Sequence, residues 1–268
     1  MAMPIIDKFR LDGQVAVITG AGKGIGAGIA RTFAEAGADV VIGARTTTDL
    51  EKVAADIRAL DRQALVVPTD VLDFDQLQGL VDSTMEHFGR IDILVNNAGG
   101  FPPKPVAQTS ASEFEAAMRF NVTTAYEMSR LCAPLMVETA GSGNILNISS
   151  IAGHKPAPCF TAYGTAKGAL SLLTRELAQE FAPRVRVNAI AVGSTRTDAL
   201  DTVLTPEIED TMVELTPMAR LGEVEDLALG ALYLCSPAAS YVTGDILGVN
   251  GGLERLNMPM PRAWGGMG

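Results

Sequence analysis

Three side chains suited to proton transfer lie close together in the sequence. Tyr163 and Lys167 are four residues apart, and Ser150 precedes them after a strand-like run. Because positions i and i+4 of a helix lie one above the other, the lysine ammonium is expected one turn from the phenol. A nearby positive charge lowers the pKa of a phenol from its usual value of about 10. The sequence therefore predicts that Tyr163 acts as a general acid or base, with Ser150 hydrogen-bonding an oxygen that changes charge.

A tyrosine and a lysine at this spacing also occur on ordinary solvated helix faces, so the chemistry depends on the rest of the chain. The N-terminal part has the pattern of a nucleotide-binding βαβ unit. Its strand, helix and second strand are predicted at residues 15–19, 25–36 and 39–44.

A glycine-rich turn joins the first predicted strand to the helix. Gly20 permits a tight turn, Gly24 lets the backbone approach a diphosphate, and Gly26 lets the helix pack closely on the sheet. The free amide groups of the helix N-terminus, where Ile25 lies, would bind the phosphates. The turn predicts a dinucleotide site.

Taken together, the motifs resemble those of the classical short-chain dehydrogenase/reductase family. The turn has the spacing Thr-Gly-x-x-x-Gly-x-Gly, and the resemblance covers about residues 9–253. The later motifs follow in the family's order: Asp70, Asn96-Asn97-Ala98-Gly99, Asn121, Ser150, Tyr163 and Lys167. The resemblance implies a catalytic tetrad of Asn121, Ser150, Tyr163 and Lys167, in which Asn121 bends its helix and holds a water in the proton relay.

The resemblance also implies contacts to the cofactor outside the turn. Asp70 and Val71 are expected near the adenine, although Asp70 has the alternative role of a turn or N-cap residue before the next helix. Asn97 is expected against the cofactor. Thr195 and Thr197 stand where family members contact its amide and diphosphate.

One position departs from the family pattern. The family has Pro-Gly after the sixth strand, and this chain has Val192-Gly193. Proline fixes φ near −65° and valine does not. We therefore expect the loop beside the nicotinamide to be more mobile or differently aimed.

The choice between the two nicotinamide cofactors rests on the end of the second strand. An NAD site usually has an acidic residue there to bind the ribose 2′-hydroxyl. Here the position is Ala44, with Arg45 next to it and Lys23 in the glycine turn. Two cations and no carboxylate favour a 2′-phosphate. We predict NADP(H) rather than NAD(H), the alternative being that both cations are solvated surface charges.

Composition excludes several classes of protein. The 268 residues are 47% hydrophobic and 19% charged, which suits a folded core. The net charge is −10 without a basic cluster, so nucleic-acid binding is not expected. Three widely spaced cysteines and two histidines give neither a disulfide framework nor a metal site. With no long apolar stretch, we expect a cytoplasmic protein without a membrane segment.

Strand-like and helix-like segments alternate along the whole chain, which predicts an α/β fold. We expect one doubly wound Rossmann-type domain over residues 1–268, with helices flanking a seven-stranded parallel sheet. The remaining strands are predicted at 64–68, 91–95, 144–148, 185–191 and 244–252, and long helices at 112–138 and 161–181. In the family the equivalent helices pack between subunits, which implies a dimer or tetramer.

Two segments near the C-terminus bear on the substrate. The amphipathic stretch 196–218 corresponds to the family's substrate lid. Its apolar residues form either a pocket wall or an ordinary buried helix face; they are Leu200, Val203, Leu204, Ile208, Met212 and Leu215. The tail, 254–268, is either a flexible terminus or, with Trp264, a cap on a neighbouring subunit's pocket.

The predicted reaction is reversible hydride transfer between a nicotinamide cofactor and a ketone or secondary alcohol. Segments 97–105, 205–209 and 235–240 resemble bacterial 7α-hydroxysteroid dehydrogenases, which favours a steroid-like or cyclic substrate. The alternatives are a 3-oxoacyl-carrier-protein reductase and, outside the enzymes, an inert NADP(H)-sensing binding protein.

Overall fold

Seven strands lie side by side in one parallel sheet in the computed structural model, which describes residues 4–202 and 204–262. Their order is β3-β2-β1-β4-β5-β6-β7. The strands after β3 are therefore added on the other side of β1, and the strand order reverses between β1 and β4. The strands are β1 Val15–Thr19, β2 Asp39–Ala44, β3 Ala64–Pro68, β4 Ile93–Asn96, β5 Gly143–Ser150, β6 Val185–Val192 and β7 Ile246–Val249. This is the doubly wound Rossmann fold that the sequence predicts.

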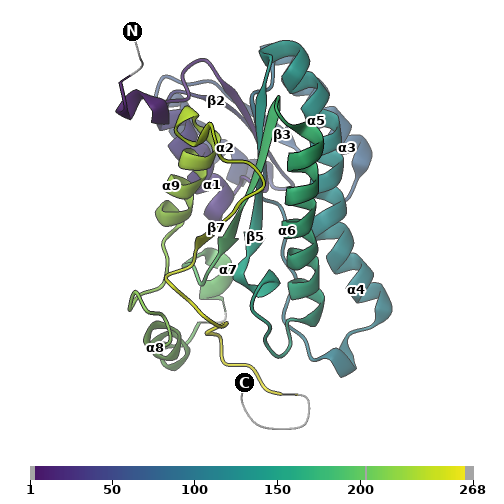
Figure 1. Ribbon diagram of the computed structural model, residues 1–268, viewed down its shortest axis with the longest axis vertical. Helices are drawn as coiled ribbons and strands as arrows, with labels where there is room; N and C mark the ends of the chain where they lie inside the picture. The colour runs from purple at the N-terminus through teal and green to yellow at the C-terminus, as the bar shows by residue number, and fades with distance from the viewer. Residues whose placement is uncertain (1–3, 203, 263–268) are drawn as a thin grey trace.

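Helices cover both faces of the sheet (Figure 1). One buried cluster joins the sheet to α1 Gly24–Glu35, α2 Thr47–Arg58 and α9 Val224–Cys235. The other joins it to α3 Phe74–Phe88, α5 Thr124–Ala140 and α6 Thr161–Phe181. The shorter helical elements include η1 Ile6–Phe9, α4 Ala111–Met118, α7 Asp198–Asp201 and α8 Pro206–Glu214. Figure 1 shows α7, α8 and the C-terminal segment at the end of the sheet toward which the strand arrows point.

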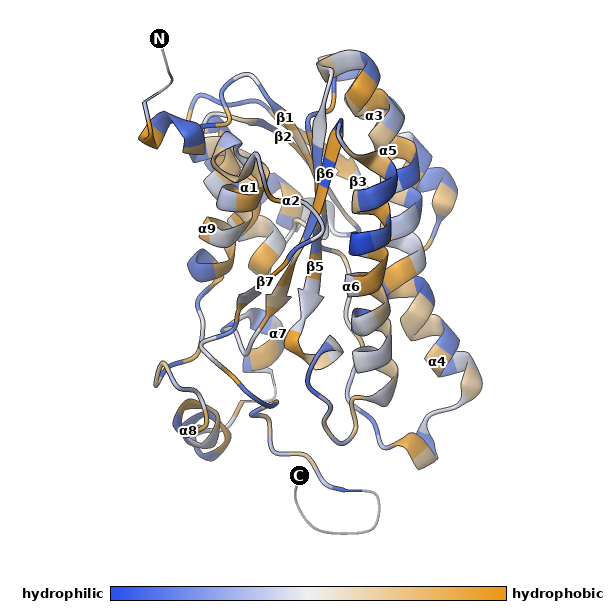
Figure 2. Cartoon of the chain, viewed as in Figure 1, coloured by the Kyte–Doolittle hydropathy of each residue, from blue (hydrophilic) through white to orange (hydrophobic). Residues whose placement is uncertain are grey.

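The hydrophobic pattern explains the layers. All five residues of β1 and the middle of β2 are buried, as expected for strands covered on both faces. Figure 2 shows hydrophobic residues along the central strands, while the helices mix hydrophobic and hydrophilic residues. In the described part of the chain, no helix combines the length and the hydrophobicity that crossing a membrane requires.

The predicted helix 112–138 is in fact broken. A π-helical segment, Arg119–Thr123, separates α4 from α5, and Asn121 lies inside it with 1% of its surface exposed. The Asn121 amide donates to the carbonyls of Ala117 and Gly100 at 2.9 and 3.1 Å. These bonds from a helix-interior asparagine explain why the regular hydrogen-bond ladder is interrupted here.

Several element ends also differ from the sequence prediction. The strands predicted at 144–148 and 185–191 extend to Ser150 and Val192, and the last strand is Ile246–Val249 rather than 244–252. The fourth strand begins at Ile93 rather than at 91, and directly before it the Asp92 carboxylate accepts from the Val15 amide and from Arg90. Helix α3 is capped by Asp73, which accepts from two backbone amides of its first turn. Asp70 is therefore not the N-cap; its carboxylate accepts from the Leu72 amide in a turn.

The glycine turn and the end of β4 are in close contact. Gly20 has φ of +65°, a conformation that glycine adopts without strain. A Cβ on Gly26 would lie 2.4 Å from Asn97 Nδ2 and 2.5 Å from the Gly20 oxygen. The first turn of α1 therefore has room for hydrogen alone at this position.

We predict that Gly26→Ala lowers the free energy of unfolding by about 1–3 kcal/mol, because the added methyl group overpacks this contact. The control is Gly79→Ala in α3, where a Cβ would meet nothing within 4 Å. That substitution should be neutral or stabilise by about 0.5–1 kcal/mol, as expected for glycine in a helix interior. Urea denaturation measures the free energy of unfolding of both variants. Equal losses in the two would contradict the overpacking of the contact at Gly26.

Candidate active site

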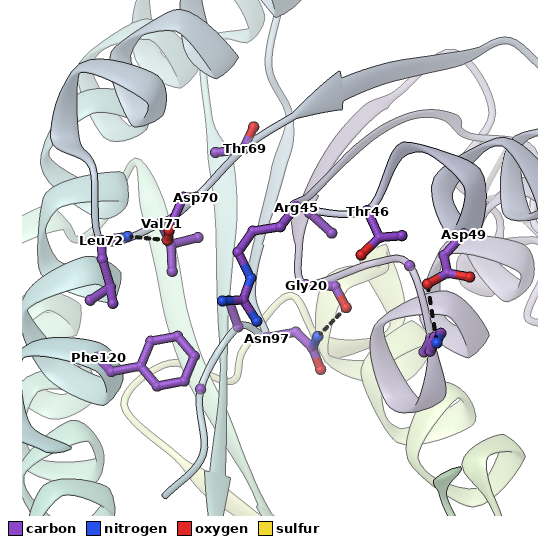
Figure 3. Close-up of a pocket in the computed structure, with 15 residues that line it drawn as sticks. Gly20, Arg45, Thr46, Asp49, Thr69, Asp70, Val71, Leu72, Asn97 and Phe120 are labelled. Carbon is purple, nitrogen blue, oxygen red and sulfur yellow. Dashed lines mark hydrogen bonds and ion pairs between the residues drawn. The ribbon is translucent and has the colours of Figure 1, made fainter. Parts of the chain in front are cut away.

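Three cavities follow the carboxyl edge of the sheet. The first, of about 410 Å³, includes Gly20, Lys23, Arg45, Asp70, Val71 and Asn97 among its lining residues (Figure 3). The second, of about 490 Å³, is lined by Lys23, Gly24, Arg196, Thr197 and neighbours. The third, of about 230 Å³, is lined by Ile25, Ser150, Thr195, Thr197 and mostly apolar residues. Most of the residues predicted to contact the cofactor thus line these three adjoining cavities.

The cations predicted for a 2′-phosphate have different surroundings. Arg45 points into the first cavity (Figure 3) and makes no ion pair with any residue in the described ranges 4–202 and 204–262. Lys23 instead pairs with Asp49 at 3.1 Å. Lys52 approaches the same carboxylate at 3.7 Å. Arg45 is therefore the cation available to an anionic ligand, and Lys23 would have to be shared with Asp49.

The N-terminus of α1 fits a diphosphate. Its N-cap residue, Lys23, provides no side-chain hydrogen bond to the first turn. Gly24 has φ of +52°, and a Cβ there would meet only the Thr197 side chain within 4 Å. The amide groups of the first turn therefore lack a side-chain acceptor where two cavities meet, and such groups bind phosphate well.

Asn97 connects β1 to β4 at the point where the strand order reverses. Its Nδ2 donates to the carbonyls of Thr19 and Gly20, each at 3.0 Å, and its backbone amide donates to the Thr19 hydroxyl at 3.1 Å. The side chain borders the first cavity beside the glycine turn (Figure 3). Both amide protons are already used within the chain, so a direct contact of Asn97 with a cofactor stays a prediction.

Ser150 lines the third cavity, and Tyr163 interacts with it from outside that lining. Ser150 ends β5 and is 8% exposed, and its hydroxyl hydrogen-bonds the phenol of Tyr163. Burial raises the pKa of Tyr163, and the bond with Ser150 lowers it by less. The expected lowering of the Tyr163 pKa is thus wrong for the structure as it stands.

The surroundings of Lys167 give the physical reason. The side chain lies in α6 with Tyr163, as the spacing predicts, and only 4% of its surface is exposed. Its ammonium group donates to the Ile148 carbonyl at 2.7 Å and lies 5.7 Å from the centre of the Tyr163 ring. Burial lowers the pKa of Lys167 to about 7, so the group is only partly charged near neutrality. A partial charge at this distance lowers a phenol pKa only weakly.

Asn121 and Lys167 come together across Gly99. A Cβ on Gly99 would lie 2.8 Å from Asn121 Oδ1 and 3.0 Å from Lys167 Nζ. The Asn121 oxygen is fixed because it accepts from the Gly100 amide at 2.8 Å. Glycine at this position therefore leaves open the space that two polar groups share, at the border of the first cavity.

The loop after β6 is anchored by hydrogen bonds in place of the family's proline. Val192 pairs with Ser150 on one side and Val249 on the other, and the next amide donates to the Val249 carbonyl at 3.0 Å. Thr195 then forms a parallel bridge with Gly222. The strand ladder thus continues through the position at which proline would have removed a donor. Whether the loop is more mobile stays a prediction.

Known proteins resemble this chain over nearly its whole length. A family profile described as Enoyl-(Acyl carrier protein) reductase matches residues 20–254. The 7α-hydroxysteroid dehydrogenase of Escherichia coli K12 is 45% identical over 253 residues, covering 94% of this chain and 98% of the relative. The chain belongs to the classical short-chain dehydrogenase/reductase family.

Two further relatives show that proteins similar to this chain differ in the substrates that their names give. A solved 7α-hydroxysteroid dehydrogenase, complexed with NADH and 7-oxo glycochenodeoxycholic acid, is 44% identical with a TM-score of 0.91, covering 95% of this chain and all of that one. A 3-oxoacyl-[acyl-carrier-protein] reductase of Thermotoga maritima is 32% identical over 245 residues, or 91% of this chain and 99% of the relative. This short-chain dehydrogenase is accordingly an oxidoreductase that acts on CH–OH groups with a nicotinamide cofactor.

The segment 196–218, predicted to be a substrate lid, forms only part of the predicted pocket wall. Leu200 and Met212 line the third cavity, whereas Leu204, Ile208 and Leu215 do not, and Val203 lies outside the described residues. At the start of this segment, beside the second cavity, Arg196 pairs with Glu209 and approaches Asp201 at 3.8 Å and Glu223 at 3.9 Å.

Several residues of the site escaped the sequence analysis. The first cavity is also lined by Thr46, Asp49, Thr69, Leu72 and Phe120, and the third by Leu256, Asn257 and Met258. Phe120 directly precedes Asn121, so its place next to a predicted catalytic residue could have identified it from the sequence. The others carry no motif. Of the tail predictions, the one on Trp264 lies outside the described residues.

We predict a pH-dependent stability that originates in Lys167. The folded-state pKa of about 7 lies below the ordinary value of 10.5, so between these limits the unfolded chain binds more protons. The contribution of Lys167 to stability therefore rises as pH rises through this window. Relative to Lys167→Met, the wild type should gain on the order of a few kcal/mol between pH 6.5 and 9.5.

Urea denaturation followed by circular dichroism at several pH values measures this gain. The methionine variant also lacks the bond to the Ile148 carbonyl, which offsets its stability at every pH, while the slope of the difference reports the proton that Lys167 releases. The matched control is Lys8→Met, which removes an exposed lysine and so tests the same change of side chain away from the buried site. A pH-independent difference for Lys167→Met would contradict a buried lysine of low pKa.

Proposed function

We propose that this enzyme uses NADP(H) to interconvert a ketone and a secondary alcohol on an apolar, steroid-like or cyclic substrate. The observation that carries the proposal is the position of Ser150. Its hydroxyl is hydrogen-bonded to the Tyr163 phenol and borders a cavity whose lining is mostly apolar. Apolar residues of that lining include Ile151, Ala152, Phe160, Leu200 and Met212. A carbonyl oxygen at Ser150 would thus have a proton donor beside it and its carbon skeleton among hydrophobic side chains.

Each of these residues would have its own role in the reaction. In reduction, Tyr163 gives its phenolic proton to the carbonyl oxygen, and in oxidation it takes the proton of the alcohol. Ser150 donates a hydrogen bond to the same oxygen as negative charge develops on it. The nicotinamide, when bound, supplies or accepts the hydride.

Lys167 would serve both binding and proton transfer. A cofactor ribose hydroxyl is a hydrogen-bond acceptor for the ammonium group and would favour its charged form, which in turn would lower the pKa of Tyr163. With its own pKa near 7, Lys167 gains and loses a proton readily at neutral pH. We infer that protons reach it from solvent through a water held at Asn121, in the space that Gly99 leaves open.

The preference for NADP(H) rests on charge at the end of β2. Ala44 provides no carboxylate to repel a 2′-phosphate, and Arg45 points into the cavity without a partner among residues 4–202 and 204–262. A free guanidinium binds phosphate in a forked geometry. The solved relative with NADH shows that the family uses the other cofactor as well.

We also propose that the enzyme works in the cytoplasm as a homodimer or homotetramer. Apolar side chains on two neighbouring helices support the oligomer, since Tyr126 of α5 and Leu172 of α6 are 45% and 55% exposed. Three unpaired cysteines suit a reducing compartment; they are Cys132, Cys159 and Cys235.

Tyr163→Phe should reduce kcat by about 10²- to 10⁴-fold, because the proton donor is lost while the ring remains. The dissociation constant for NADPH should change by less than about twofold, because the phenol is not the main cofactor contact. Oxidation of NADPH, followed at 340 nm, measures turnover with a steroid ketone, a small cyclic ketone and a 3-oxoacyl thioester.

Each arm of this experiment decides between functions. Turnover of the thioester alone would favour the carrier-protein reductase over the steroid-like substrate. Tight NADPH binding with no turnover of any ketone would favour the inert sensor. Near-native turnover by Tyr163→Phe would show that another group donates the proton.

Ala44→Asp should raise the dissociation constant for NADPH at least tenfold, or about 1.4 kcal/mol, because the new carboxylate would repel the 2′-phosphate. It should also tighten NADH binding, since a carboxylate at this position hydrogen-bonds the ribose hydroxyl. Calorimetric titration of both cofactors measures the change. Ala111→Asp, an equal charge change at the exposed start of α4, is the control and should leave both constants unaltered. Tighter binding of NADH than NADPH by the wild type would refute the preference.

A further inference from the structure

The C-terminal segment of this chain folds against its own substrate cavity. It follows β7, and Figure 1 shows it beside α8 at the carboxyl end of the sheet. Leu256, Asn257 and Met258 line the third cavity together with Ser150. The cavity therefore has a wall that comes from the end of the same polypeptide.

A single side chain joins this segment to two others. Asn257 is 2% exposed, and its Nδ2 donates to the Met212 carbonyl and to the Thr216 hydroxyl, each at 2.9 Å. Its Oδ1 accepts from the Ser194 hydroxyl at 2.5 Å. The amide thus connects the tail to the end of α8 and to the loop after β6, and both of its polar atoms have partners.

The far end of the segment has a contact on the opposite side of the cavity. The Cys159 thiol donates to the Pro261 carbonyl at 3.5 Å, and Phe160, the next residue, lines the cavity. Between this contact and Asn257, the segment extends from the lid to the loop that precedes α6. Leu256 and Met258 lie on either side of Asn257 and border the cavity.

Hydrogen bonding explains why asparagine suits the position. Aspartate would keep an acceptor for Ser194 but lose both donors. An apolar residue would leave the Ser194 hydroxyl without this acceptor, while the Thr216 hydroxyl would keep only its bond to the Met212 carbonyl. Such a residue fixes the path of the backbone. The side chains beside it are then held in one place rather than free to move aside.

We propose that Asn257 is a positioning residue that fixes the C-terminal segment as one wall of the substrate pocket, so that Leu256 and Met258 determine the size of the apolar substrate. The proposal deepens the proposed function, on which it rests for the class of substrate. The part of the ligand that packs against this wall is uncharged, because the lining of the cavity contains apolar and uncharged polar residues.

The first test follows the segment itself and needs no substrate. In hydrogen–deuterium exchange of the full chain, Asn257→Ala should speed exchange across residues 253–262 and 206–216 by about tenfold or more. Arg255→Ala, at an exposed neighbour in the same segment, should match the wild type. Unchanged exchange in Asn257→Ala would overturn the anchoring role.

The second test separates size selection from a merely structural effect, in variants that keep Asn257. Met258→Ala and Leu256→Ala are assayed with the largest and the smallest ketone that the wild type reduces. For the large ketone KM should rise about fivefold or more while kcat stays within about twofold, since contact area lost outside the reacting atoms weakens binding. For the small ketone KM should stay within about twofold. Equal changes for both ketones would overturn the proposal.

The two experiments distinguish the proposals. A wild type that reduces no steroid or cyclic ketone would contradict the proposed substrate class, while the exchange experiment would still decide whether Asn257 anchors the wall.

Discussion

The cofactor end of this enzyme depends on the side-chain amide of Asn97. Parallel strands leave their carboxyl ends at one edge of the sheet, and where the strand order reverses, two loops diverge. Asn97 joins these loops by donating to the carbonyls of Thr19 and Gly20 at 3.0 Å. Gly26 completes the contact, because only hydrogen fits between its Cα and that amide. The position of the α1 N-terminus, and so of the phosphate site, follows from this contact.

The catalytic end depends on a different physical effect, the burial of a cation. Lys167 is nearly inaccessible, and its ammonium group donates to the Ile148 carbonyl. Desolvation lowers its pKa to about 7 and leaves the Tyr163 pKa raised. The expected effect of the lysine on the tyrosine assumes a full positive charge. In the folded chain a further hydrogen-bond acceptor beside the ammonium group, such as the cofactor ribose proposed above, would favour that charge.

The elements predicted correctly from the sequence are those whose structure depends on residues close together in the chain. The first three strands were predicted to the residue, because each is a short apolar run bounded by glycine, aspartate or another turn residue. The resemblance predicted a bend at Asn121, but the apolar pattern of 112–138 did not show a break there, because the break depends on a bond between Asn121 and Gly100, 21 residues away. Asn257 was missed for the same reason, since its partner Met212 is 45 residues distant in a segment without a motif. The pairing of Lys23 with Asp49 likewise depends on how α2 packs beside the turn.

The wall formed by Leu256 and Met258 has a consequence for how such enzymes diversify. Both residues follow the last strand of the sheet, so no later element of the described chain depends on them for its position. Substitutions there would alter the pocket without disturbing the glycine turn or the buried lysine. New substrate ranges could thus arise in evolution by changes to the segment after the last strand, on a framework that stays the same.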